Sequence, residues 1–428
     1  MIKHVFLFAC VLLTAVAAKA QQPAKAADFA IAEGDRVVFY GDSITEQRLY
    51  TTDIELFILT RFPDRKVSFF QSGVGGDRVS GGSGGPIDQR LRRDVFDHQP
   101  TVVTIMLGMN DGYDRALAPD IFESYKNGYR YIVEAIQKEM PKARLTLLKP
   151  SPFDDVTHAE NFPGGYNKTL LQFGFYLGEL AAEKHASTAD LNAPVVDALQ
   201  KAKAKNVSLD TLLIPDRVHP GPAIHWVMAE SVLEAWGAMP EVTSVHIDAG
   251  GKLAAQVSNT EVSGITKSAG RLRWTQMDKA LPLPMGPLES DPLLQLTLSS
   301  SDLIRALDSE SLRVTSLPPA SYKLRIDERE IGAFSAEQLA AGINLALLET
   351  PMLEQSRRVA MDTQVKNTLE TQLFDLGDSN DPVLPETIKQ LAAAEEKAVA
   401  HQRADAQPVA HHYELLPIAT AAPKTTPK

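Results

Sequence analysis

Ser43 is the first residue whose type and position could support covalent chemistry. It follows the apolar stretch 37–40 and the pair Gly41-Asp42, so an expected buried strand runs into a tight turn at the serine. Such a strand fixes the backbone while a side chain at its carboxyl end emerges at the edge of the sheet, which suits a nucleophile. The competing interpretation is a serine that caps a helix or closes a turn.

Asp216 and His219 lie three residues apart in the polar, Pro-containing stretch 214–221. This spacing in a turn can place the carboxylate beside one ring nitrogen while the other faces outward, which orients the imidazole as a general base. A capping Asp and a polar loop His are the alternative.

Two further stretches could supply hydrogen-bond donors. Gly75 and Gly76 follow the second expected strand, where a glycine can present a bare N–H to a developing negative charge. Asn110 ends the third expected strand and could aim its amide into the same crevice as Ser43. Because Asn-Asp-Gly is also a strong turn sequence, a plain turn remains open at Asn110.

Alternating elements would bring these stretches together. From residue 36 to about 237, apolar strand-like runs alternate with helix-like runs, which predicts a parallel sheet flanked by helices. The carboxyl ends of parallel strands share one edge of the sheet. We therefore expect Gly75 and Gly76, Asn110, and the stretch 214–221 to lie at the same edge as Ser43. The expected strands are 37–40, 67–71, 102–107, 145–148 and 189–191.

The four stretches occur in the order of the four blocks of a known family. Together they resemble the GDSL, or SGNH, hydrolase family of esterases and lipases, of the long secreted bacterial type with a C-terminal β-rich domain. The resemblance covers about 36–237 and implies a flavodoxin-like three-layer α/β/α fold. The blocks are Gly41-Asp42-Ser43, Gly75-Gly76-Asp77, Gly108-Met109-Asn110-Asp111 and Asp216-Arg217-Val218-His219.

That resemblance implies a role for each matching residue. Ser43 would be the nucleophile, His219 the base and Asp216 the orienting acid. The oxyanion hole would combine the N–H groups of Ser43 and Gly76 with the side chain of Asn110. The supporting residues would be Asp42, Asp77 and Asp111, and neither metal nor cofactor is expected. One departure is Gln71, which stands where the second block usually begins with Asn.

The N-terminal sequence and the net charge of the chain indicate where the protein is located and which partners are disfavoured. A basic start, an apolar run over 5–17 and Ala18-Lys19-Ala20 predict a signal peptide over 1–20, and hence export to the periplasm or beyond. The formal net charge of −11 disfavours nucleic acid and anionic lipid as partners. No integral membrane span is expected.

The composition predicts further units after the catalytic domain, which we place at 28–238. Residues 241–334 are expected to form a smaller β-sandwich-like domain, with a strand over 293–298 and a hairpin that pairs 312–314 with 322–326. A helical segment over 335–406 and a disordered tail over 407–428 follow. Trp274 is a candidate for stacking on a sugar, or simply a core residue.

The expected function is a secreted serine esterase that removes a short acyl group, acetyl foremost, from a small-molecule or polysaccharide ester. A lipase or phospholipid hydrolase using the same residues, and a non-catalytic carbohydrate-binding envelope protein, are the alternatives. Asp154, Asp155 and His158 could ligate a metal, but a solvated or substrate-lining loop is the favoured interpretation.

Overall fold

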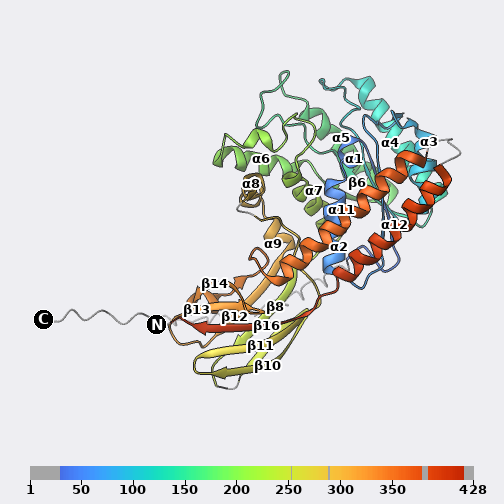
Figure 1. Cartoon of the computed structure of the whole chain (residues 1–428). Coiled ribbons are helices and arrows are strands. Elements are labelled where there is room, and N and C mark those ends of the chain that lie inside the picture. The colour runs from blue at the N-terminus through green and yellow to red at the C-terminus, as the bar shows by residue number, and fades with distance from the viewer. Residues whose placement is uncertain (1–28, 252, 288–289, 378–383, 419–428) are drawn as a thin grey trace, which may run out of the picture.

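A five-stranded parallel sheet forms the centre of the first half of the chain (Figure 1). The computed structural model describes residues 29–251, 253–287, 290–377 and 384–418, so the expected signal peptide lies outside the described residues. The strands lie in the order β2-β1-β5-β6-β7, and every pairing is parallel, as the sequence predicts. Their bounds are β1 Arg36–Gly41, β2 Ser68–Gly73, β5 Val102–Met106, β6 Arg144–Lys149 and β7 Ser187–Asp190.

Helices cover both faces of this sheet. Strand β2 lies on one side of β1, whereas β5, β6 and β7 follow one another on the other side. The chain therefore reverses its direction along the sheet after β2. Because crossovers between parallel strands are right-handed, α2 lies on one face of the sheet and α3, α4 and α5 lie on the other. Helices α6 and α7 join α2, which gives the expected three layers. The bounds are α1 Ser43–Glu46, α2 Leu49–Arg61, α3 Ile87–Asp94, α4 Pro119–Glu139, α5 Asn167–Lys184, α6 Ala193–Lys205 and α7 Pro222–Ala235.

Two short helices from the second half also pack on this core. Helices α8 (Pro292–Ser300) and α9 (Leu303–Leu307) lie against α6 and α7, and their leucines join the core around the parallel sheet. The strand expected at 293–298 is therefore wrong. The side chain of Asp291 accepts the N–H of Leu294 at 2.9 Å, and the following proline occupies the first turn, so an Asp-Pro helix start overrides the alternating leucines.

The second half forms two facing sheets with a shared core, the β-sandwich-like unit that the sequence predicts. One sheet has the order β10-β11-β16-β13-β14 and the other β15-β12-β8-β9. The bounds are β8 Glu241–Asp248, β9 Ala254–Ser258, β10 Thr260–Ser268, β11 Arg271–Asp278, β12 Ser309–Thr315, β13 Ser321–Ile326, β14 Arg329–Ser335, β15 Ile343–Asn344 and β16 Ala410–Pro417, with α10 at Ala336–Ala341.

Two expectations for this unit are corrected. Strands β12 and β13 do not form a hairpin, because β12 pairs with β8 and β15 whereas β13 pairs with β14 and β16 in the other sheet. The segment that was expected to begin a disordered tail contains β16, which lies between β11 and β13. Its alternate residues His411, Tyr413 and Leu415 are buried.

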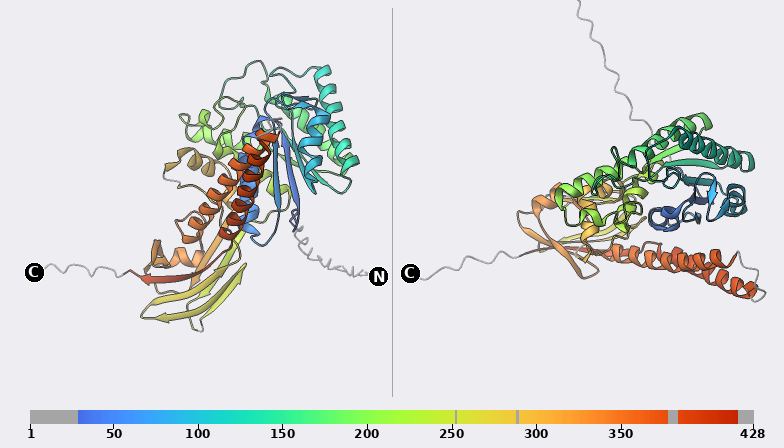
Figure 2. Two further views of the ribbon diagram at one scale, coloured as in Figure 1. Left: turned by 45° about the vertical axis from the view of Figure 1, so that its right-hand side comes forward. Right: turned by 90° about the horizontal axis from the view of Figure 1, so that it is seen from above.

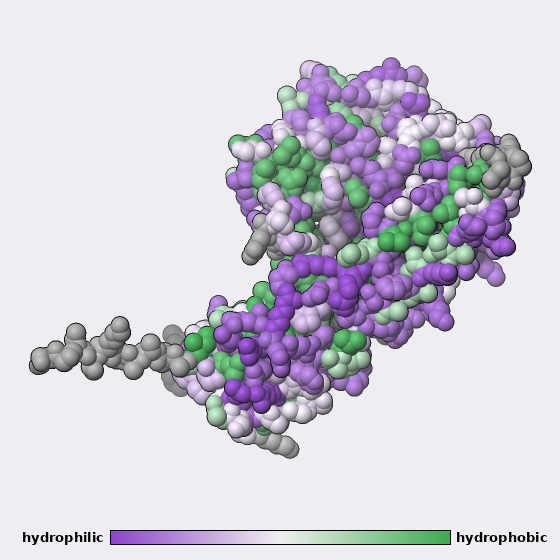
Figure 3. All heavy atoms as spheres, in the orientation of Figure 1, coloured by the Kyte–Doolittle hydropathy of each residue, from purple (hydrophilic) through white to green (hydrophobic). Residues whose placement is uncertain are grey.

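A pair of long helices connects the two units. Helices α11 (Pro351–Gly377) and α12 (Leu384–Asp405), here called the helical pair, run from the β-sandwich along the first unit and back to β16 (Figures 1 and 2). Helix α11 packs on α2. Figure 3 shows apolar surface along this pair, where α11 exposes Met361 and Val365. None of the helices within the described residues is long and apolar enough to span a membrane.

Candidate active site

The structure brings Ser43, His219 and Asp216 into one hydrogen-bonded chain. The Nε2 atom of His219 lies 2.8 Å from Oγ of Ser43, and its Nδ1 atom lies 2.6 Å from Oδ2 of Asp216. A carboxylate accepts only, so Nδ1 carries the ring hydrogen and the lone pair of Nε2 faces the serine hydroxyl. This arrangement can take a proton from Ser43.

The loop before α7 fixes the positions of Asp216 and His219. Oδ1 of Asp216 accepts the N–H groups of Val218 at 3.0 Å and of His219 at 2.7 Å. Burial alone would raise the pKa of Asp216, but these bonds and the bond to the ring of His219 outweigh it and hold the pKa below its usual range. The side chains remain 55% exposed for Asp216 and 36% for His219, so water can reach the site.

Two backbone donors follow the ends of the paired strands β1 and β2. Gly76 is exposed and has φ +75°, a conformation that favours glycine. Across the part of the chain that the structure describes, the N–H groups of Ser43 and Gly76 have no acceptor. The side chain of Asn110 donates one amide hydrogen to the carbonyl of Asp77 at 3.0 Å, which leaves its second hydrogen for a ligand.

The predicted supporting carboxyls hold the turns that carry these groups. Oδ1 of Asp42 accepts the N–H of Ile44 at 3.1 Å and caps α1, so Ser43 occupies the first position of that helix. Oδ1 of Asp111 accepts the N–H of Val79 at 3.0 Å. Burial raises the pKa of Asp42 and the pKa of Asp111 to about 7 each. Both side chains therefore act on the backbone and not on a ligand.

Arg90 is a structural residue of the site that the sequence analysis missed. Its side chain is fully buried, forms ion pairs with Asp77 and Asp94, and donates to the carbonyl oxygens of Gly41 at 3.3 Å and Ser72 at 3.1 Å. It thereby ties the Gly76-Asp77 turn to the ends of β1 and β2. The only sequence signal is the spacing of Arg90 and Asp94, four residues apart on one face of α3.

The side chains considered as possible metal ligands have protein partners. Asp154 accepts hydrogen bonds from the backbone of Val156 and Thr157 and lies 3.1 Å from Nδ1 of His158, while Asp155 pairs with Arg217 at 2.5 Å. These carboxylates stabilise the loop beside the triad. Trp274 is a core residue, 2% exposed and stacked on Tyr413, so it offers no sugar platform.

One other group of potential metal ligands lies on the helical pair. Among the described residues, Asp362, His401 and Asp405 bring possible ligand atoms within 4.8 Å of one another. The ring of His401 bonds to Asp362 at 2.9 Å, and Arg358 lies 3.7 Å from Asp405. An ion-pair network between α11 and α12 accounts for this group.

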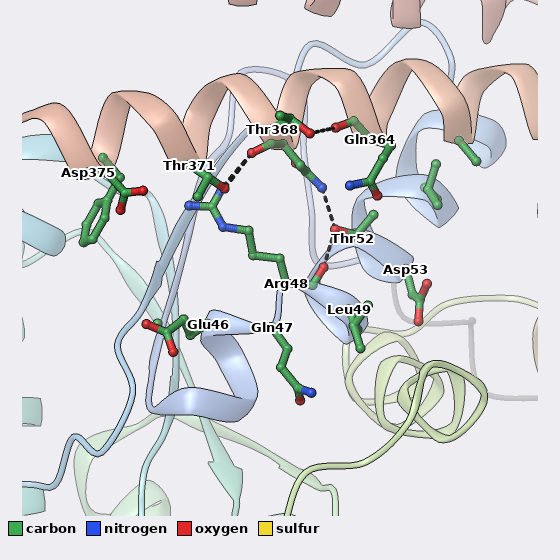
Figure 4. A pocket seen from close by; sticks show the side chains of 15 residues that line it. Glu46, Gln47, Arg48, Leu49, Thr52, Asp53, Gln364, Thr368, Thr371 and Asp375 are labelled. Carbon is green, nitrogen blue, oxygen red and sulfur yellow. Dashed lines mark hydrogen bonds between the residues drawn. The ribbon is translucent and has the colours of Figure 1, made fainter. Parts of the chain in front are cut away.

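Two pockets adjoin the segment that follows Ser43 and share Gln47. The first, here called the triad pocket, has a volume of about 460 Å³ and is mostly apolar; its lining includes Asp216 and His219 together with Leu212, Pro215 and Leu293. The second, here called the interhelix pocket, has a volume of about 450 Å³ and lies between the α1–α2 segment and α11 (Figure 4). The triad pocket is mostly apolar, whereas the interhelix pocket is lined by polar and apolar groups together.

Residues 39–227 match the model of the GDSL-like Lipase/Acylhydrolase family. The chain carries a GDSL-type hydrolase domain. Acetylxylan esterase from Geobacillus stearothermophilus is 23% identical to the hydrolase over 224 residues, which are 48% of this chain and 96% of that protein. Family and homologue together make the chain a carboxylic ester hydrolase.

Solved structures extend the comparison. A gut microbial diltiazem-metabolizing enzyme is 27% identical to the hydrolase, covers 91% of this chain and 98% of its own, and has a TM-score of 0.77. Its likeness therefore includes the β-sandwich and the helical pair. The acetylxylan esterase Axe2 of Geobacillus stearothermophilus is 22% identical, covers 49% of this chain and 96% of its own, and has a TM-score of 0.40.

Proposed function

We propose that the hydrolase is an exported serine esterase that removes short acyl groups, acetyl foremost, from carbohydrate esters. The observation that carries the proposal is the chain of hydrogen bonds from Asp216 through His219 to Ser43, with lengths of 2.6 and 2.8 Å. Free backbone N–H groups at Ser43 and Gly76 adjoin it. This is the minimum set that acyl transfer to a serine requires.

The reaction follows from this geometry. His219 takes the proton of Ser43 as Oγ attacks the ester carbonyl, and the carboxylate of Asp216 stabilises the imidazolium. The oxyanion receives hydrogen bonds from the N–H groups of Ser43 and Gly76 and from the free amide hydrogen of Asn110. His219 then protonates the departing alcohol. Water, activated by the same imidazole, attacks the acyl-enzyme, and its collapse releases the acid and restores Ser43.

The substrate class is supported by the site and by relatives. The triad pocket is at the small end of the ~300–1,000 Å³ range of ligand pockets, which favours a short acyl group over a fatty chain. The homologue from Geobacillus stearothermophilus is an acetylxylan esterase, which removes acetyl groups from a polysaccharide. Hydrolysis of 4-nitrophenyl esters from acetate to octanoate tests this preference, and octanoate turned over faster than acetate would favour the lipase alternative.

Replacement of the nucleophile tests the mechanism. Ser43→Ala is expected to lower kcat on 4-nitrophenyl acetate by at least ~10⁴-fold, because no other group can form the acyl-enzyme. Ser80→Ala, at an exposed serine of a nearby loop, is the matched control and should retain wild-type activity. A serine-reactive phosphonate should label Ser43. Activity retained by Ser43→Ala, or a folded protein that resists the probe, would exclude a serine esterase.

Export is proposed from the basic start, apolar run and small residues of 1–20. N-terminal sequencing of the protein recovered from the periplasm or medium should begin at Gln21. A full-length protein retained in the cytoplasm would contradict it.

A further inference from the structure

The interhelix pocket is lined from two parts of the chain that are far apart in sequence. Helix α11 contributes one face at helical spacing, and the α1–α2 segment forms the opposite wall, as Figure 4 shows. The lining residues used below are Glu46, Gln47, Asp53, Gln364, Thr368 and Thr371. Since this wall comes from the helical pair, the four sequence blocks of the hydrolase domain do not describe it.

The pocket adjoins the helical turn that carries Ser43. Glu46 ends the helical turn that Ser43 begins, and its carboxylate packs so closely on Gly75 that a Cβ there would lie 2.9 Å from Oε2. Gly75 precedes Gly76, the donor proposed for the oxyanion. Gln47 lines both this pocket and the triad pocket. An ester bound at Ser43 can therefore extend one of its two parts into the interhelix pocket.

The walls are held in place before any ligand binds. The side chain of Asn367 donates to Oγ1 of Thr52 at 2.7 Å, and Arg48 donates to the carbonyl of Asn367 at 3.2 Å. Behind them Lys366 and Glu55 form a buried ion pair at 2.8 Å. A preformed pocket loses little ordering entropy on binding, which favours a specific ligand site.

Polar groups in the pocket lack partners. Asp53 is only 9% exposed, yet its carboxyl group bonds to nothing among the described residues. Burial raises the pKa of Asp53 well above its usual range. The side chain of Gln364 is exposed, and its amide bonds to no other group among the described residues. A carboxyl group that lines a cavity and has no protein partner is free to bond to water or to a ligand that enters the cavity.

A buried histidine orients Gln47 at the junction of the two pockets. Nδ1 of His225 accepts the N–H of Tyr50 at 3.1 Å, so the ring hydrogen is on Nε2 and is donated to Oε1 of Gln47 at 3.2 Å. Burial lowers the pKa of His225 to about 3, which keeps this ring neutral. The amide hydrogens of Gln47 are therefore the donors available at the junction.

The chemistry of the lining favours neutral hydroxyl groups. The pocket alternates amide, hydroxyl and carboxyl groups with the apolar surfaces of Leu49 and Phe374, a mixture that suits the hydroxyls and C–H faces of a sugar. Its cation, Arg48, already faces Glu370 at 3.6 Å, while Glu46 and Asp375 add negative charge. Phosphate and other anionic groups are disfavoured by this charge.

We propose that the interhelix pocket binds the alcohol part of the ester, a neutral polyhydroxylated group such as a sugar unit, and that Gln364, Asp53 and Gln47 determine this specificity. The inference rests on the proposed function, because it places the leaving group of that reaction. It assigns the helical pair a direct part in substrate selection.

Selective kinetics test the proposal. Gln364→Ala should lower kcat/KM on an acetylated xylooligosaccharide about tenfold relative to 4-nitrophenyl acetate, mainly through KM, because one hydrogen bond to the sugar is lost. Asp53→Asn should shift the same ratio in the same direction. Gln372→Ala, at an exposed glutamine of α11 outside the pocket lining, is the matched control and should leave the ratio unchanged.

The outcomes separate this proposal from the proposed function. If Gln364→Ala and Asp53→Asn leave the ratio at the wild-type value while the Ser43→Ala variant is inactive, the esterase assignment stands and the pocket assignment is wrong. If Gln364→Ala and Asp53→Asn lower kcat/KM more on a cationic ester such as acetylcholine than on the sugar ester, the proposal is also overturned. Competitive inhibition by free xylotriose that is weakened about tenfold in Gln364→Ala would support it.

Discussion

At the scale of the residue, the carboxylate of Asp216, the proposed orienting acid, is open to solvent. Its side chain is 55% exposed, but three bonds hold it: two backbone N–H groups and the ring of His219. These bonds keep the pKa of Asp216 below its usual range, so the orienting group stays ionised throughout mildly acidic conditions.

Removal of this charge tests the role of Asp216. Asp216→Asn should lower kcat on 4-nitrophenyl acetate by ~10²–10⁴-fold with little change in KM, because the imidazolium loses its partner. Solvent access should place the loss near the lower limit, since water can partly replace the carboxylate. Asp155→Asn, a loop carboxylate paired with Arg217, is a control for general effects on this loop. A loss below threefold would show that His219 needs no orienting acid.

Much of the candidate site could be predicted because its signal is local. Ser43, Gly76 and Asn110 lie in short turns that follow expected strands, so the order of the strands brings them to one edge, whereas Asp216 and His219 lie in the loop before α7. The interhelix pocket could not be predicted in this way. Its outer wall comes from a helix about 300 residues downstream, and no local pattern states where α11 docks.

At the scale of the element, α3 carries Arg90, whose buried side chain holds the Gly76-Asp77 turn. Arg90→Met should destabilise the fold by about 3–5 kcal/mol, because Asp77 and Asp94 would remain buried without their partner. Urea unfolding measures this loss. Arg92→Met, at an exposed arginine of the same helix, should stay within about 0.5 kcal/mol of wild type. Equal stability of the two variants would show that the buried network is dispensable.

The errors at this scale have a common cause. The alternating residues of β12, β13 and β16 correctly indicate buried faces, but periodicity does not specify a partner strand. The strand β16 was missed because the composition after residue 407 suggested disorder, although His411, Tyr413 and Leu415 alternate as a buried face should. The partner of each of these strands is far away in the sequence, and the residues of a single sequence do not indicate which distant strand pairs with it.

At the scale of the whole molecule, the helical pair joins two units that the sequence presents as separate. The acetylxylan esterase homologue is covered almost completely by the hydrolase domain alone, whereas the diltiazem-metabolizing enzyme matches 91% of this chain. The helical pair is therefore an addition to the hydrolase core in this type of chain. Its buried polar contact with α2 is centred on Glu55, which accepts from Lys366 and from Gln402 at 3.0 Å.

The buried ion pair gives a test of this coupling. Lys366→Met should cost about 3–5 kcal/mol in urea unfolding, because Glu55 keeps a buried charge without its cation, and should loosen α11 from α2. The double variant Lys366→Met/Glu55→Gln removes both charges and keeps the bond to Gln402, so most of the loss should be recovered. Lys389→Met, on the exposed side of α12, should change stability by less than about 0.5 kcal/mol. Because α11 forms one wall of the interhelix pocket, the single variant should also lose sugar-ester activity before 4-nitrophenyl acetate activity as urea is added. If both activities are lost at the same urea concentration, α11 does not detach from α2 independently of the rest of the fold. If the double variant recovers no stability, the Lys366–Glu55 ion pair does not hold α11 on α2.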